Sequence, residues 1–172
     1  MVPLSRRTDF SEPPTATARA LIPVVATAVA SLVALLPIVA SMPLLPPIGL
    51  MTLVAWRLLR ADASPLWVAL PLGAWDDLLS GAPIGTAICG WTAVLLALDV
   101  IDGRTPWRDN RTDWAIASAV IAAMLVFALL IARNAGSDAG VALLWPQFVL
   151  SALLFPSVSR VCAMLDRWRT AR

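Results

Sequence analysis

Six apolar segments, separated by short polar or proline-rich links, constrain this chain more than any other feature. Of its 172 residues, 59% are hydrophobic and only 14% are charged, whereas a soluble domain carries about 25% charged residues. Several of the apolar runs approach the roughly 20 residues that a helix needs to cross a membrane. The pattern predicts an all-α, polytopic membrane protein with one membrane domain, residues 20–165. The six predicted transmembrane helices are residues 20–42, 47–59, 64–80, 84–101, 114–132 and 139–158.

The arginines predict how the chain is oriented. All 13 basic residues are arginine, and 12 of them share one side of the membrane if the spans alternate from a cytoplasmic N-terminus. Because loops rich in arginine stay in the cytoplasm, the N-terminal tail (residues 1–19) and the basic C-terminal tail (residues 166–172) are both predicted to be cytoplasmic. A five-span arrangement would place one arginine cluster outside and is disfavoured. The second and third spans are the shortest, and a re-entrant pair at that place is the alternative.

Two adjacent carboxylates, Asp76 and Asp77, interrupt the apolar run near the end of the third predicted span. A charge inside a membrane helix costs roughly 2.5–3.5 kcal/mol, so these acids need a partner or a position near the surface. A turn follows at once, because glycine and proline cluster over residues 81–85. The residues of this central motif are Gly73, Asp76, Asp77, Gly81, Pro83 and Gly85.

Three interpretations of the acids stay open at this point. One acid can accept N–H groups from the turn or from the start of the next helix, where a negative charge is favoured. The acids can instead form an ion pair inside the membrane with Arg133, the arginine predicted at the same depth. They can also contact a substrate.

A catalytic pair of carboxylates is not expected. The best second acid is Asp99, but helical rise places it roughly 15 Å in depth from Asp77. Acids that share a proton must be nearly in contact. Asp99 is predicted to pair with Arg57 or Arg60, which would anchor the inner face, and Asp99→Asn is therefore expected to be mild.

The residue types present argue against enzymatic chemistry. The chain contains no histidine, which removes the commonest general base and metal ligand. Cys89 and Cys162 both fall in apolar segments and are predicted to be buried structural thiols. We expect no cofactor, no metal, no nucleic acid and no small-molecule substrate. Small residues in the fourth and fifth spans predict close helix packing, at Gly85, Ala87, Gly90, Ala115, Ala119 and Ala123.

The central motif resembles that of the rod shape-determining protein MreD family. The resemblance lies in Gly73, Asp77, Gly81 and Gly85, which follow one another at intervals of four residues. Other features agree with it. The second span opens at Pro47 and closes at Trp56, and the last span has Pro156, which is followed by Arg160 and then by the basic tail. From Ser5-Arg6-Arg7 to Asp166-Arg167-Trp168-Arg169, the chain is similar to the alphaproteobacterial branch of the family.

The resemblance implies a non-enzymatic subunit of the cell-elongation complex in the bacterial inner membrane. Its expected partners are MreC, the MreB filament, RodA and a class B penicillin-binding protein, and its expected role is to maintain rod shape by helping to organise sidewall peptidoglycan synthesis. In the motif the acid aligns with Asp77, and Asp76 is an additional residue here.

A second hypothesis comes from a different class of protein. Six short spans rich in small residues also suit the substrate-binding membrane subunit of an energy-coupling transporter. Asp76 and Asp77 would then lie near an outward-facing pocket. The chain has no tyrosine and no conspicuous polar set in its last two spans, which argues against this alternative.

Overall fold

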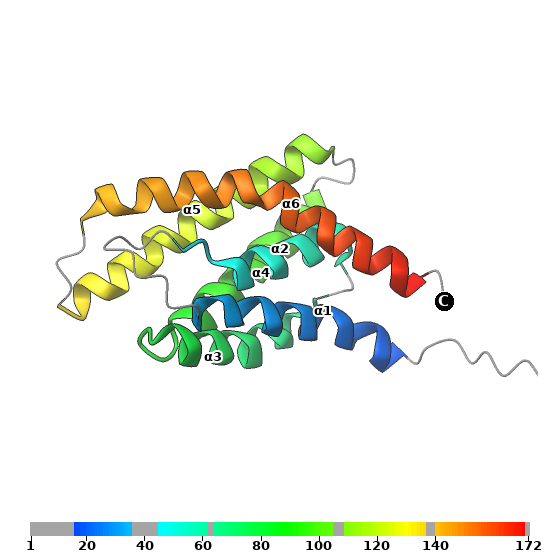
Figure 1. Ribbon diagram of the computed structural model, residues 1–172, viewed down its shortest axis with the longest axis horizontal. Coiled ribbons are helices and arrows are strands. Elements are labelled where there is room, and N and C mark those ends of the chain that lie inside the picture. The colour runs from blue at the N-terminus through cyan, green and yellow to red at the C-terminus, as the bar shows by residue number, and fades with distance from the viewer. Residues whose placement is uncertain (1–15, 36–44, 62–63, 105–108, 137–139, 171–172) are drawn as a thin grey trace, which may run out of the picture.

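The protein is a bundle of α-helices. The computed structural model describes residues 16–35, 45–61, 64–104, 109–136 and 140–170, and these ranges contain helices and no strand (Figure 1). The all-α prediction is confirmed. The α-helices are α1 (Ala16–Ser31), α2 (Ile48–Leu59), α3 (Ala69–Ser80), α4 (Thr86–Arg104), α5 (Asn110–Asn134) and α6 (Leu144–Thr170). Short 3₁₀ helices follow α1 at Leu32–Leu35 and lead into α3 and α6 at Leu66–Val68 and Val141–Leu143.

Three of these helices are long and apolar enough to cross a membrane. Their qualifying stretches are Thr86–Gly103 in α4, Asn110–Asn134 in α5 and Leu144–Trp168 in α6. The apolar stretches Leu21–Ser31 and Ile48–Leu59 are shorter. With 12 residues each, α2 and α3 are about 18 Å long. The expected continuation of the first span to residue 42 lies outside the described residues.

The last helix is longer than the sequence predicted. α6 runs on to Thr170, although the span was expected to end at residue 158, so the predicted tail is helical as far as that residue. Pro156 lies inside the helix and has no N–H to donate to the carbonyl of Ala152. The indole N–H of Trp114 on α5 donates to that carbonyl instead, at 2.9 Å. The helix therefore passes the proline without an unsatisfied acceptor.

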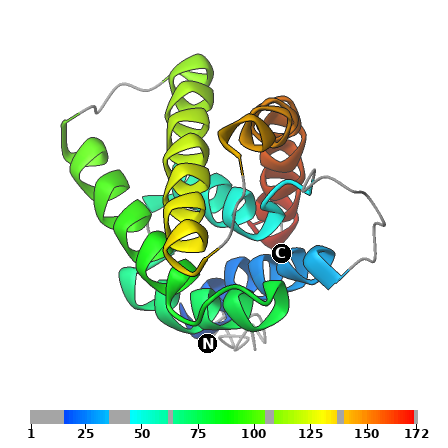
Figure 2. The same cartoon turned by 90° about the vertical axis from the view of Figure 1, so that its left-hand side faces the viewer.

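Helix α2 forms the centre of the bundle. Most of its side chains are apolar and buried, as expected of a helix that is hydrophobic on all sides. Figure 2 shows α2 in cyan with the other helices arranged around it, and it packs against α1, α4, α5 and α6. The buried residues of its core segment are Leu50, Met51, Leu53, Val54, Ala55 and Trp56.

The longest contact between neighbouring helices joins α3 to α4 as a hairpin. Consecutive α-helices alternate in direction, so α1 begins and α6 ends on the same side of the molecule (Figure 1). That side also holds the end of α4 and the start of α5. The central motif lies at the opposite end, where α3 turns into α4.

The prediction of small-residue packing is wrong for α5. Its buried residues are Ala117, Ile121, Leu125 and Leu129, whereas Ala115, Ala119 and Ala123 are exposed. On α4 the prediction fits better at Gly90, because a Cβ atom there would stand 2.3 Å from Met124 Sδ on α5. The two sets on α5 have the same spacing of four residues, and bulkier side chains fill the interior.

Candidate functional site

Asp77 joins α3 to α4. Its Oδ2 accepts the N–H of Gly85 at 2.8 Å, and its Oδ1 accepts the N–H of Ala87 at 2.7 Å. The first N–H groups of a helix have no partner within the helix, and the carboxylate supplies one from the neighbouring helix, together with a favourable charge. Only 2% of Asp77 is exposed. This is the arrangement that the first interpretation of the acids expected.

The glycines of the motif give the chain the conformations that this joint needs. Gly81 ends α3 in the left-handed region at φ 67°, and Gly85 precedes α4 at φ 106°. A side chain at either residue would strain the backbone. Between them, the carbonyl of Pro83 accepts both the N–H and the hydroxyl of Thr86. The turn is therefore fixed at both ends and in its middle.

Gly73 allows the two helices to approach. A Cβ atom at this position would lie 2.7 Å from the backbone N and Cα of Ile88 on α4. Backbone atoms cannot move aside as a flexible side chain can. The four residues spaced at intervals of four, Gly73, Asp77, Gly81 and Gly85, thus have one common effect: they hold α3 tightly against the start of α4.

Asp76 points elsewhere. Together with Ser31 on α1 and Ser80 on α3 it lines a cavity of about 270 Å³, to which α2 contributes Gly49 and α6 contributes Gln147. The Ser31 hydroxyl is buried beside the Asp76 carboxylate, without a well-formed hydrogen bond to any described residue. The two adjacent acids therefore have different surroundings.

The ion pairs between described residues lie away from the motif. They join Arg57 to Asp99 and Asp102, and Arg60 to Asp166. None of them joins Arg133 to Asp76 or Asp77, and both oxygens of Asp77 are taken by backbone N–H groups. Arg133 itself is exposed at the end of α5.

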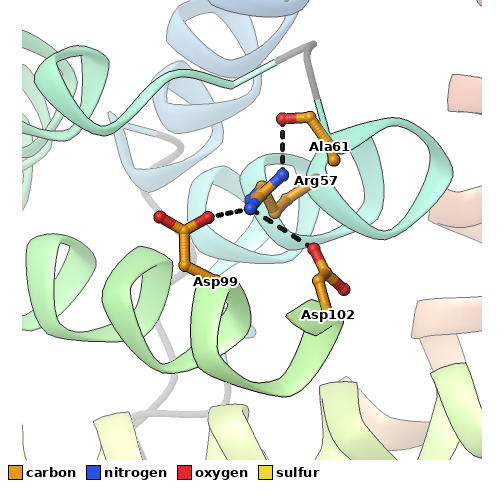
Figure 3. Close-up of polar contacts among 4 residues, drawn as sticks. All are labelled: Arg57, Ala61, Asp99 and Asp102. Carbon is orange, nitrogen blue, oxygen red and sulfur yellow. Dashed lines mark hydrogen bonds and ion pairs between the residues drawn. The ribbon is translucent and has the colours of Figure 1, made fainter. Parts of the chain in front are cut away.

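Arg57 is the buried centre of the larger ion-pair cluster. Only 6% of its side chain is exposed, and it interacts with the Asp99 carboxylate, with Asp102 Oδ2 at 3.3 Å and with the carbonyl of Ala61 (Figure 3). The sequence indicated a pair between Asp99 and either Arg57 or Arg60. It did not indicate Asp102 as the second acid, although that residue lies three positions further along α4, on the same helical face.

Arg60 pairs with a residue that was assigned to the C-terminal tail. Its Nε donates to Asp166 Oδ2 at 2.9 Å. Asp166 is buried because α6 continues beyond the predicted end of the span. Arg57 on α2 and Arg60, the residue directly after α2, therefore tie the central helix to α4 and to α6.

The described residues contain no group of three or more His, Cys, Asp or Glu side chains that could hold a metal ion. Asp77 and Asp99 bind at opposite ends of α4, since 12 residues of helix from Ala87 to Asp99 span about 18 Å. They cannot share a proton. Cys162 is buried as predicted, but Cys89 is exposed, because it lies on a face of α4 that no neighbouring helix covers.

Comparison with family models, curated proteins and solved structures found no match to this chain. What the geometry offers by itself is a fixed helix hairpin, a buried arginine cluster and the cavity beside Asp76. The hairpin is the feature to which the central motif contributes every one of its glycines.

Proposed function

We propose that this chain is a non-enzymatic scaffold subunit of the bacterial cell-elongation complex, located in the inner membrane. The observation that carries the proposal is the use of the motif. Gly73, Asp77, Gly81 and Gly85 all serve to fix one hairpin, and each oxygen of Asp77 already accepts a backbone N–H of that hairpin. A motif of this kind gives a protein a rigid surface, which is what a scaffold needs.

The proposal includes six membrane spans with both termini in the cytoplasm. Three helices are long and apolar enough to cross, and the alternating directions of all six α-helices support a common orientation. The arginine count of 12 to 1 then places the starts of α1 and α5 and the end of α6 in the cytoplasm. The short helices α2 and α3 fit such a bundle if the bilayer thins around them.

The outer face of the hairpin is the surface that we propose for partner contact. It consists of exposed apolar side chains in the short helix before α3, along α3 and in the turn, which are Trp67, Leu70, Leu78 and Ile84. In a membrane, a helix of a partner can pack on such a face when the hairpin behind it is rigid. The resemblance to the MreD family supplies the partners: MreC, the MreB filament, RodA and a class B penicillin-binding protein.

Gentle purification of the tagged protein from its native membrane tests the proposal. Recovery of MreC, RodA or the penicillin-binding protein supports it, and recovery of none of them contradicts it. Asp77→Ala should lower either the folded amount or the recovery of partners, since it loosens the hairpin. Leu78→Ala is the matched surface variant: it should leave the folded amount unchanged and reduce recovery alone.

The second candidate function is that of a substrate-binding membrane subunit of an energy-coupling transporter. The cavity of about 270 Å³ beside Asp76 favours it, because a carboxylate and a buried hydroxyl line the same space. A metabolite retained through purification, or recovery of a coupling ATPase in place of wall-synthesis proteins, would support this function over the first.

A further inference from the structure

A second, larger cavity lies at the end of the bundle away from the central motif. It has a volume of about 560 Å³ and opens between the end of α2, the start of α5 and the middle of α6. The residues that line it are Ala55, Leu58, Leu59, Asn110, Arg111, Asp113, Trp114, Phe155, Pro156, Ser159, Arg160 and Ala163. Neither the scaffold role nor the transport alternative makes use of it.

Two arginines on different helices face this cavity. Arg111 belongs to the first turn of α5 and Arg160 to α6, and neither forms an ion pair with another residue that the structure describes. They differ in this from Arg57 and Arg60, which are bound to acids nearby. Asp113 also lines the cavity, but it takes part in an interaction of its own within the protein. Within the part of the chain that the structure describes, these two cationic groups of the cavity therefore have no ion-pair partner.

Part of the cavity wall is apolar. Leu58 and Leu59 come from α2 and Phe155 from α6. Both α5 and α6 are long and apolar enough to cross a membrane, so the cavity lies where such helices would leave the hydrocarbon layer. Trp114 lies beside it, held by its hydrogen bond to Ala152, and tryptophan is typical of that depth.

We propose that this cavity binds the phosphate headgroup of an anionic phospholipid. Arg111 and Arg160 bind the phosphate oxygens with charge-assisted hydrogen bonds, and the leucines and Phe155 contact the upper part of the acyl chains. A free phosphate would satisfy the arginines equally well, but it would leave the apolar wall in water. Basic pockets between membrane helices are a known type of site for anionic headgroups. The inference requires only that α5 and α6 cross a membrane and does not depend on the scaffold role.

Native mass spectrometry of the purified full chain tests the inference. The protein is titrated with phosphatidylglycerol or phosphatidylcholine, and the apparent Kd of each is measured. We expect a clear preference for phosphatidylglycerol in the wild type. The double variant Arg111→Gln/Arg160→Gln should bind phosphatidylglycerol on the order of tenfold more weakly. The control Arg133→Gln/Arg167→Gln removes the same net charge away from the cavity and should bind like the wild type.

A further variant and a competitor make the outcome decisive. Ser159→Asp adds a negative charge to the cavity without removing an arginine, and it should weaken phosphatidylglycerol binding while phosphatidylcholine binding stays the same. If the arginine variant and the control lost the same affinity for phosphatidylglycerol, the lipid would be responding to the overall positive charge of the protein and not to the cavity. That result would overturn the inference. Displacement of the lipid by millimolar inorganic phosphate or glycerol phosphate would also overturn it, because the site would then recognise a soluble anion.

Discussion

Among single residues, Asp77 has the most clearly defined structural role, because its carboxylate caps the start of α4. In Asp77→Ala the N–H groups of Gly85 and Ala87 lose their acceptors, and a buried donor without a partner costs about 1–3 kcal/mol. We expect a clear fall in the free energy of unfolding, measured by denaturant titration in detergent micelles. Asp77→Asn keeps one acceptor oxygen and should lose less.

The adjacent acid provides the control for this experiment. Asp76 faces a cavity, and no backbone N–H of the described residues is among its partners. Asp76→Asn should therefore change the free energy of unfolding much less than Asp77→Ala. If the two substitutions proved equally damaging, the cap on α4 would not be what makes Asp77 important.

The two acids around Arg57 should be able to replace each other. When one of them is neutralised, the other still balances the charge of the guanidinium. Asp99→Asn leaves Asp102 and the carbonyl of Ala61 on the guanidinium, and more than half of the Asp99 side chain is exposed. The single variant is expected to be mild. The double variant Asp99→Asn/Asp102→Asn leaves a buried cation without a counter-ion and should cost on the order of 3 kcal/mol.

A double-mutant cycle measures this coupling. The two single variants and the double variant are unfolded under the same conditions, and the sum of the single effects is compared with the effect of both. Additive, small losses would mean that the guanidinium of Arg57 finds enough water or carbonyl oxygen to do without either acid.

At the scale of helices, the contact between α3 and α4 depends on the missing side chain of Gly73. Gly73→Ala places a Cβ atom against the backbone of Ile88, which forces the two helices apart. Overpacking of this kind costs about 1–3 kcal/mol. The midpoint of thermal unfolding should fall accordingly.

Gly103 is a matched control in α4. A Cβ atom there meets no described atom outside its own stretch of α4 within 4 Å, and alanine favours the helix over glycine by roughly 0.5–1 kcal/mol. Gly103→Ala should therefore leave the thermal midpoint unchanged or raise it. If the thermal midpoint fell by a similar amount in both variants, the loss at Gly73 could not be attributed to the close contact between α3 and α4.

The sequence predicted contacts between residues close together in the chain better than contacts between residues far apart in it. Asp77 and the N–H groups that it binds are only 8 and 10 residues apart, and turn chemistry indicated their arrangement. The pair between Arg57 and Asp99 followed from a general need, because charges in apolar helices require partners. Arg60 and Asp166 are 106 residues apart, and their pairing depends on how far α6 extends.

Two errors have a related physical cause. The last span was expected to end at residue 158, shortly after Pro156, but Trp114 on another helix satisfies the carbonyl that the proline leaves free, and α6 continues to Thr170. On α5, the small and the bulky residues repeat with the same period, so periodicity could not tell which face the neighbouring helices cover. Both outcomes depend on the packing between helices, which a local sequence pattern does not reveal.

At the scale of the whole molecule, arginines and their ion pairs gather at one end of the bundle. The ion pairs of α2, the cavity with Arg111 and Arg160, and the ends of α4 and α6 lie together, and the hairpin turn of the motif lies at the opposite end. Most of the arginines among the described residues belong to the first of these ends. Positively charged segments are retained in the cytoplasm during insertion, so one orientation should be strongly preferred.

Labelling with a thiol reagent that cannot cross membranes tests this orientation. Cys89 and Cys162 are first replaced by alanine, and single cysteines are then placed at Asn110 or at Ala135, which are exposed positions near opposite ends of α5. Ala135→Cys should be labelled in intact cells whose outer membrane is permeable to the reagent, whereas Asn110→Cys should react only after the inner membrane is opened. The reverse pattern would contradict the proposed topology. Labelling of both positions in intact cells would show that α5 does not cross the membrane, which would remove the basis for a lipid headgroup between Arg111 and Arg160.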